Sequence, residues 1–273
     1  RLDIKNFTFN NKQLTDFNCR ICSFSASGDV ETLDYPTITF NVVEVAGNDM
    51  FRKTSAKYES ALQSSPIQIC KDICQIDVEN KYFTQQEVRA IYKWLDIRDY
   101  KKFTIDNELF ENVYFIGGFT SIAPVKHAGR IIGFELVFTA DRPYGLSDDI
   151  TETFSLSGSN LTKTIENDSD DLSPVYPKKL TITLRQAGDL TITNSLDDRT
   201  FGIKNCENNE VITIDCVNRI IQTSSDTHNV YDDFNYNFFR LMQTETDTEN
   251  EFTFSLPCDV EMTYNEVRKV GFI

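Results

Sequence analysis

The residues of this 273-residue chain that are best suited to chemistry are its cysteines. Cys19 and Cys22 have the C-x-x-C spacing that occurs in zinc sites and in thiol–disulfide enzymes. A structural zinc needs about four ligands, and Cys70 and Cys74 lie in a strand-like segment that does not obviously supply the other two. A redox motif would open a helix, whereas this pair falls in an expected strand. We therefore expect reduced, packed thiols and neither a metal nor a redox centre.

Histidine chemistry has two candidates, His127 in PVKHAG and His228 in SDTHNV. Neither stands in a recognisable catalytic setting, because the chain contains no G-x-S-x-G elbow, no glycine-rich phosphate loop and no H-E-x-x-H. We expect both to be surface histidines. The sequence therefore predicts no catalytic residue and no cofactor-binding residue.

Clustered carboxylates are the remaining candidate for a ligand site. Asp168, Asp170 and Asp171 lie in a segment rich in Ser, Asp and Pro, and oxygen ligands on loops are what Ca²⁺ prefers. A solvated acidic loop is the simpler interpretation, and we predict no metal site there.

The elements that must position these residues follow from composition and length. Apolar residues make up 40% of the chain and charged residues 25%, which is typical of a globular protein, and the length predicts two domains. No apolar run approaches the roughly 20 residues of a bilayer crossing, and no secretory leader is visible. We expect a protein without a membrane span that is synthesised in a cytoplasm.

The net charge of −15 is unevenly distributed. Up to Gly145 the chain holds 17 Lys and Arg against 19 Asp and Glu, whereas the rest holds 10 against 23. Such an acidic surface repels phosphates, so direct nucleic-acid binding is not expected.

One amphipathic helix stands out, at about residues 84–97. Thr84 and Glu87 have capping-box spacing, so the helix should begin at about Gln85. An apolar stripe recurs at spacings of three and four, formed by Val88, Ile91 and Leu95 with Tyr92 or Trp94. The other side is polar, with Gln86, Arg89 and Lys93. The stripe already explains Trp94 as a core residue, so a sugar-stacking role is not needed for it.

Short strands surround this helix in the sequence. Alternating patterns predict strands at residues 2–9, 18–25, 37–45, 65–76, 103–105, 113–115, 119–126 and 130–139. Residues 46–52 are predicted as a loop, and a bulge or short break is expected near Lys71-Asp72. The first half is therefore predicted to be a small β-barrel or sandwich with one α-helix.

A domain boundary is predicted after Asp141-Arg142-Pro143-Tyr144-Gly145, which separates residues 1–145 from residues 146–273. Residues 147–161 read as a polar boundary segment and residues 166–177 as a polar loop. Beyond them, segments of about five residues, among them LTITL, VITIDC, NFFRLM and EFTFSL, predict an all-β sandwich, with a final strand that could return to the first domain.

The order of these elements resembles the distal tail protein family of long, flexible-tailed bacteriophages. The residues that carry the resemblance are Phe9, Asn11, Thr84, Trp94-Leu95, Asp106, Val113-Tyr114-Phe115, Arg142 to Gly145, Pro177, residues 212–216 and Arg219-Ile220. The loop at residues 47–52 departs from the family's Gly-Arg-Asp-Gly type of loop.

The resemblance implies a mainly β fold with a galectin-like C-terminal sandwich and a non-enzymatic, structural role in the virion. Six copies would form a ring at the tail tip that joins the tail tube protein to the baseplate hub, with receptor-binding proteins as further partners. The near-neutral half would carry the ring contacts, and the acidic half would face solvent.

Two other functions compete with this one. A galectin-like sandwich could bind host-surface sugars, but sugar-binding galectins use a His-Asn-Arg and Trp set, and the second half has one His and no Trp. A wall hydrolase is third, because no catalytic set is complete.

Overall fold

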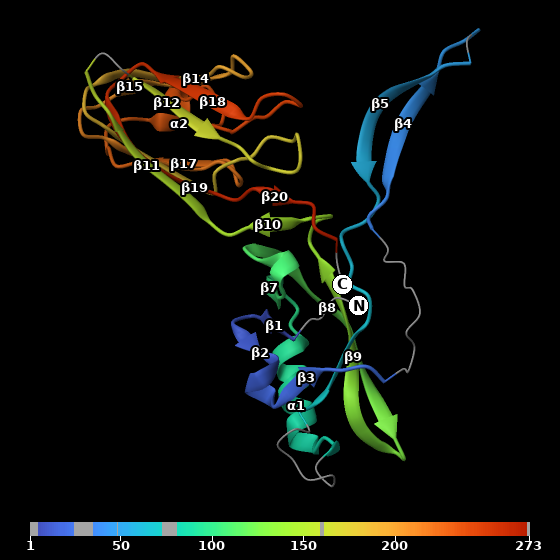
Figure 1. The fold of residues 1–273 in the computed structure, drawn as a ribbon. Helices are drawn as coiled ribbons and strands as arrows, with labels where there is room; N and C mark the ends of the chain where they lie inside the picture. Colours follow the sequence, from blue (N-terminus) through green and yellow to red (C-terminus); the bar gives the residue numbers. More distant parts are fainter. Residues whose placement is uncertain (1–4, 25–34, 48, 73–80, 159–160, 272–273) are drawn as a thin grey trace. The chain divides into compact units, whose positions relative to one another are not determined.

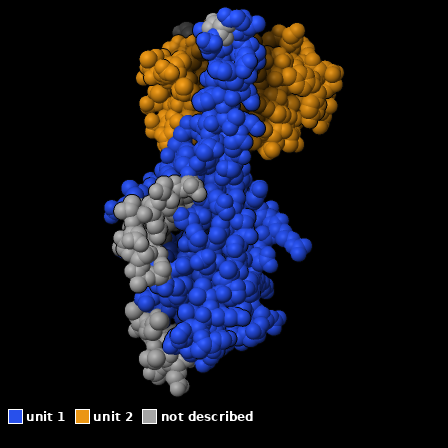
Figure 2. All heavy atoms as spheres, turned by 90° about the vertical axis from the view of Figure 1, so that its right-hand side faces the viewer, with its two compact units in different colours: residues 1–146, 269–273 blue, residues 147–268 orange. Residues whose placement is uncertain are grey.

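The computed structural model describes residues 5–24, 35–47, 49–72, 81–158 and 161–271 (Figure 1). The fold is mainly β, as predicted, and it divides into two compact units. Figure 2 colours the first unit, residues 1–146 and 269–273, and the second, residues 147–268. The C-terminal segment is thus counted with the first unit, and Val270 packs against the core of that unit.

The first unit is built on one sheet of order β2-β1-β7-β8-β9-β6-β3. The strands on this path are β1 (Asn6–Phe9), β2 (Lys12–Gln13), β3 (Cys19–Ile21), β6 (Ile67–Lys71), β7 (Lys101–Asp106), β8 (Val113–His127) and β9 (Arg130–Ala140). Helix α1 (Gln85–Leu95) and the 3-10 turns η1 (Leu14–Phe17) and η4 (Glu108–Phe110) accompany them. The pairing path runs from β2 to β3 without closing, so the barrel alternative is wrong and the sheet is open.

Local sequence explains why these strands connect as they do. Asn10 and Asn11 adopt positive φ and turn β1 into β2, which suits asparagine because it tolerates the left-handed conformation. Ala128 and Gly129 make the equivalent turn between β8 and β9. Gly117 in β8 has no space for a side chain, since a Cβ there would lie 2.2 Å from the Thr139 carbonyl oxygen.

A second sheet of the first unit has only two strands, β4 (Ile38–Glu44) and β5 (Phe51–Tyr58), drawn as the long blue hairpin in Figure 1. The sequence predicted β4 but placed Phe51 and Arg52 in a loop and assigned no strand to the residues after them. Those two residues begin β5, which pairs with β4 along its whole length.

The second unit is a sandwich of two sheets, with strand orders β11-β19-β13-β16-β17 and β12-β18-β14-β15. The strands are β11 (Ile150–Leu156), β12 (Thr162–Glu166), β13 (Lys179–Leu184), β14 (Gly188–Asn194), β15 (Thr200–Cys206), β16 (Val211–Asp215), β17 (Ile220–Thr223), β18 (Glu249–Phe254) and β19 (Cys258–Tyr264), with the one-turn helix α2 (Val230–Asp233). The short strands β10 (Gly145–Ser147) and β20 (Val267–Arg268) lie where the chain enters and leaves this unit.

Inward-facing side chains of the two sheets form the core of the sandwich, which includes the completely buried Leu180, Ile182, Ile212 and Ile214. Two predictions in this unit are wrong. The expected polar segment 147–161 contains β11, and NFFRLM is irregular chain, bridged by Leu241 to Val175 and packed into the core through its apolar side chains. None of the helices among the described residues is long and apolar enough to cross a membrane.

Candidate functional site

Helix α1 is fixed at its N-terminus by the predicted capping box. The Thr84 hydroxyl accepts a hydrogen bond from the Glu87 N–H at 3.3 Å, and the Thr84 N–H donates to the Glu87 carboxylate at 2.6 Å. The same carboxylate pairs with Lys71 of β6, whose Nζ lies 2.7 Å from Oε1. Burial alone would raise the pKa of Glu87, but the hydrogen bonds from Lys71 and Thr84 outweigh it and lower the pKa.

Trp94 anchors the other end of α1. Its ring stacks on Phe17 at 4.4 Å and on Phe7 at 5.7 Å between ring centroids, and its Nε1–H donates to the Phe9 carbonyl oxygen at 2.9 Å. The predicted assignment of Trp94 to the core is confirmed, since the residue is 3% exposed. The polar side of the helix, with Gln86, Arg89 and Lys93, is exposed in the single chain.

The β4–β5 hairpin exposes apolar side chains along nearly its whole length. Its exposed apolar residues, here called the hairpin patch, are Ile38, Phe40, Val42, Val43, Val45, Met50 and Phe51. Phe40 is 57% exposed and Phe51 is 61% exposed. So many exposed apolar side chains on one element are typical of a surface that another protein covers.

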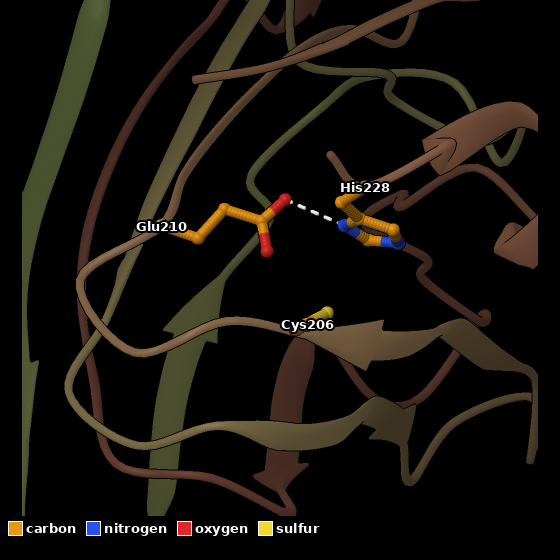
Figure 3. A group of neighbouring side chains, drawn as sticks. All are labelled: Cys206, Glu210 and His228. Atoms are coloured by element: carbon orange, nitrogen blue, oxygen red, sulfur yellow. Dashed lines mark hydrogen bonds and ion pairs between the residues drawn. The ribbon is translucent and has the colours of Figure 1, made fainter. Parts of the chain in front are cut away.

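Three residues whose side chains could ligate a metal lie together in the second unit, as Figure 3 shows. Cys206 ends β15 and Glu210 follows four residues later in the next turn. His228 precedes α2, and the fold brings it to the other two across 18 residues of chain or more. One ligand atom of each lies within 4.8 Å of the others, and all three residues are buried.

The distances within this cluster indicate a hydrogen-bonded pair. The Nδ1 of His228 lies 2.7 Å from the Glu210 Oε1. Two ligand atoms on a tetrahedral zinc with bonds of 2.0–2.1 Å stand about 3.3 Å apart. Both oxygens of the Glu210 carboxylate are already engaged, because Oε2 accepts a hydrogen bond from the Glu207 N–H and Oε1 accepts one from the Thr223 hydroxyl. The arrangement therefore fits a structural hydrogen-bonded pair better than a metal centre.

The prediction for His228 is wrong, because its side chain is only 2% exposed. Its Nε2 lies 3.4 Å from the Asp233 Oδ2, so the ring stands between two carboxylates. Burial alone would raise the pKa of Glu210. Hydrogen bonds from Thr223, Glu207 and His228 outweigh this effect and lower the pKa. His127 is exposed, as predicted, at the end of β8.

The acidic loop shows ordinary loop contacts. Asp168 is paired with Arg268, with 3.6 Å between Oδ2 and Nη2, and the Asp171 Oδ1 accepts the Ser173 N–H at 2.9 Å. Within the described residues, the clustering of three ligand groups found around Cys206 does not recur at Asp168, Asp170 and Asp171.

The C-x-x-C residues do not face a common ligand. Residues three apart in an extended segment point to opposite faces, and Cys19 lies in the core while Cys22 is half-buried. Cys74 lies outside the described residues. Burial raises the pKa of four thiols to about 12, namely those of Cys19, Cys206, Cys216 and Cys258.

The fold and these clusters define a mainly β protein of two units with one exposed apolar hairpin. Two family models cover almost all of it: one described as "Phage tail protein N-terminal domain" matches residues 2–142, and one described as "Phage tail C-terminal domain" matches residues 144–264. The first alone spans more than half of the chain. The chain therefore belongs to this family of phage tail proteins.

Solved structures extend the likeness to the distal tail fold. The crystal structure of the Dit protein of phage SPP1, described as a paradigm of the hub adsorption apparatus in phages that infect Gram-positive bacteria, aligns with a TM-score of 0.65 at 10% identity. The alignment covers 96% of this chain and 99% of that one. The predicted resemblance to distal tail proteins is thus confirmed, with the identity low enough that the likeness concerns the fold alone.

Two structures of the phage p2 baseplate in its activated conformation, one with Sr and one with Ca, align more loosely. Their TM-scores are 0.44 and 0.43 at 11% and 10% identity, over 99% and 98% of this chain and 100% and 99% of theirs. These values are too low to carry an argument. The comparison with curated proteins gives no match.

Proposed function

We propose that this chain is a structural subunit of a phage tail tip, in which six copies form a ring through the first unit. The ring would connect the tail tube protein to the hub, and the galectin-like second unit would face outward, where receptor-binding proteins could attach. Family membership and the distal-tail fold support a place in the virion after assembly in the host cytoplasm. The observation that supports self-association is the exposed apolar surface of the hairpin patch.

A second copy of the chain suits this patch for an energetic reason. A two-stranded hairpin is marginally stable alone, so the β4–β5 hairpin becomes more stable when another protein surface covers it. Full burial of a large apolar side chain contributes about 1.5–3 kcal/mol, and the seven residues of the patch are already about half-buried, so covering them contributes on the order of 5–10 kcal/mol. This is of the same order as the cost of association, so further contacts must add to it.

A ring requires two different surfaces on each subunit, one that inserts and one that accepts. The hairpin patch supplies the first. The open sheet leaves β2 and β3 as edge strands, and such edges offer unpaired backbone groups to an incoming segment. The acceptor would therefore lie on a sheet edge of the neighbouring first unit.

Mass photometry of the full chain, alone and with its neighbouring tail proteins, tests the proposal. Six copies of the 31.4 kDa chain have a mass of about 188 kDa. A chain carrying Phe40→Ser and Val43→Ser should lose this species, whereas Lys57→Ser on the exposed polar part of β5 should keep it. Electron microscopy of assembled particles that showed single copies instead of a ring would overturn the proposal.

Sugar binding gains no support from the second unit. Its one histidine, His228, has a buried side chain that is hydrogen-bonded to Glu210. The structural, non-enzymatic role therefore remains the function we propose.

A further inference from the structure

Cys22 and Cys70 lie together on one face of the first sheet. β3 pairs with β6 in a register that sets Arg20 opposite Cys70, and the Cys22 N–H continues the pairing by donating to the Gln68 carbonyl oxygen at 2.9 Å. Opposite residues of an antiparallel pair, and residues two apart in a strand, point to the same side of the sheet. Arg20, Cys22, Gln68 and Cys70 therefore share the face opposite the core residue Ile69, and the Cys22 and Cys70 side chains are hydrogen-bonded.

These two thiols line an open cavity of about 390 Å³. Its lining also includes the cationic side chains of Arg20 and Lys81. Phe24 covers one side, because its N–H is held by the Gln68 Oε1 at 2.8 Å and its ring lies against Gly133, the residue paired with Cys70. A Cβ on that glycine would meet the Phe24 ring at 2.3 Å, so the close approach depends on glycine.

The surroundings of Cys70 differ from those of the buried thiols. The hydrogen bond from Cys22 and the charge of Arg20 outweigh burial and lower the pKa of Cys70 to about 6. These contacts favour the thiolate form of Cys70, whereas burial favours the neutral thiol at Cys19, Cys206, Cys216 and Cys258. A cysteine of lowered pKa beside a second thiol, in a cavity lined by cationic side chains, is the arrangement of a reactive dithiol.

We propose that Cys22 and Cys70 form a redox-active dithiol that small organic disulfides, such as glutathione disulfide, oxidise to a Cys22–Cys70 disulfide between β3 and β6. The Cys70 thiolate attacks one sulfur of the small disulfide, which forms a mixed disulfide and releases one thiolate. Cys22 then loses its proton and attacks the Cys70 sulfur, which releases the second thiolate. Two protein thiols are oxidised, and one small disulfide is reduced to two thiols.

The disulfide would tie β3, the last strand of the first sheet, covalently to its neighbour β6. It would also bridge the chain on either side of the β4–β5 hairpin. The site is independent of the proposed ring, since it requires only the β3–β6 pairing of a single first unit.

The test uses the reduced full chain, incubated with glutathione disulfide at pH 7.5, then trapped with an alkylating reagent and mapped by peptide mass spectrometry. We expect one cross-linked peptide pair joining Cys22 to Cys70, with the loss of two hydrogens, while the four buried thiols are alkylated only after denaturation. The variant Cys22→Ala should stop at a glutathione adduct on Cys70, and Cys70→Ser should give no cross-link. The variant Cys74→Ser should behave as the unmodified chain does.

A second measurement follows the rate of Cys70 alkylation against pH. The rate should be half-maximal near pH 6, and Cys22→Ala or Arg20→Gln should move this midpoint upward, because each removes a group that stabilises the thiolate. A midpoint above pH 8 in the unmodified chain would overturn the proposal. So would a cross-link that joined any other pair, or that formed no faster than modification of Cys258.

Discussion

Replacing Glu87 by glutamine isolates the ion pair that ties α1 to β6. Glutamine retains the side-chain oxygen that a capping box needs at this position, so the variant removes the charge and leaves the cap. The partner, Lys71, has a side chain only 8% exposed, and its Nζ lies 5.3 Å from the centroid of the Phe83 ring. Without the carboxylate this ammonium stays partly buried beside apolar groups.

The size of the effect follows from burial. Removing one partner of a fully buried pair costs about 3–5 kcal/mol, whereas an exposed pair contributes about 0–1 kcal/mol. The Glu87 side chain is 40% exposed, so water replaces part of what Lys71 loses. We therefore expect Glu87→Gln to lower the free energy of unfolding of the first unit by about 1–2 kcal/mol. Adding Lys71→Met to this variant should recover part of the loss, because the unpaired charge disappears.

Trp94 is the chain's one tryptophan and lies in the core of the first unit, so its fluorescence in a urea titration reports the unfolding of that unit alone. Glu111→Gln, at an exposed position next to η4, is the matched control and should leave the urea midpoint unchanged.

The pH dependence gives a second check. The pKa of Glu87 is lowered in the folded state, so its contribution is complete above the ordinary glutamate pKa of about 4.3 and is lost as pH falls through the folded value. The difference between the unmodified chain and Glu87→Gln should therefore narrow as the pH falls below the ordinary glutamate pKa. Equal urea midpoints at pH 7, or a difference that persists unchanged at pH 3, would refute the reasoning.

Three further predictions concern other positions. Gly117→Ala should unfold the first unit or lower its free energy of unfolding by more than about 3 kcal/mol, because the new Cβ would overlap the Thr139 carbonyl oxygen. Trp94 fluorescence in a urea titration measures this loss. Glu210→Ala should lower the stability of the second unit by about 3–5 kcal/mol, because it leaves the buried partners of that carboxylate unsatisfied; calorimetry resolves this transition. The Glu210 contribution should likewise disappear as pH falls through its lowered pKa. Added Ca²⁺ should leave the calorimetric trace unchanged, because Asp168 is already paired with Arg268; a rise in the melting temperature would contradict this.

Helix α1 was predictable because its signals are local. The capping box and the apolar stripe occupy twelve consecutive residues, Thr84 to Leu95, and the helix begins at Gln85 as expected. Its end was placed two residues too late, at 97 instead of Leu95. Asp96 leaves the helical conformation, with φ −81° and ψ 71°. The adjoining residues contain no glycine or proline that would predict this helix end.

The long strand β8 was predicted in pieces because glycine normally weakens a strand. Gly117 and Gly118 separate the two predicted segments, 113–115 and 119–126, yet β8 is continuous from Val113 to His127. Gly117 is there because β9 and the Phe138 ring approach too closely for any side chain. Whether a glycine breaks a strand or permits such close packing depends on the neighbouring strand.

The clusters around His228 and Cys70 could not be predicted from the sequence for a related reason. Glu210 and His228 are 18 residues apart and meet where two connecting segments of the sandwich lie side by side. Cys22 and Cys70 are 48 residues apart and are brought together by the pairing of β3 with β6. The C-x-x-C spacing drew attention to Cys19 as the partner of Cys22. In an extended chain, the diagonal neighbour on the next strand is the partner that shares its face.

The hairpin patch shows what alternation in a strand does and does not determine. The pattern of β4 predicts a half-buried strand, and within one chain that prediction fails, since Phe40 and Val42 are exposed. An alternating apolar pattern indicates that one face of the strand is covered in the assembled protein. It does not show whether the covering side chains belong to the same chain or to another. If six first units close into a ring, the burial that β4 lacks in one chain is supplied by the next. Hydrogen exchange at Asn41 and its neighbours should then slow when the ring forms, and exchange that stayed as fast as in the monomer would separate the patch from the ring contacts.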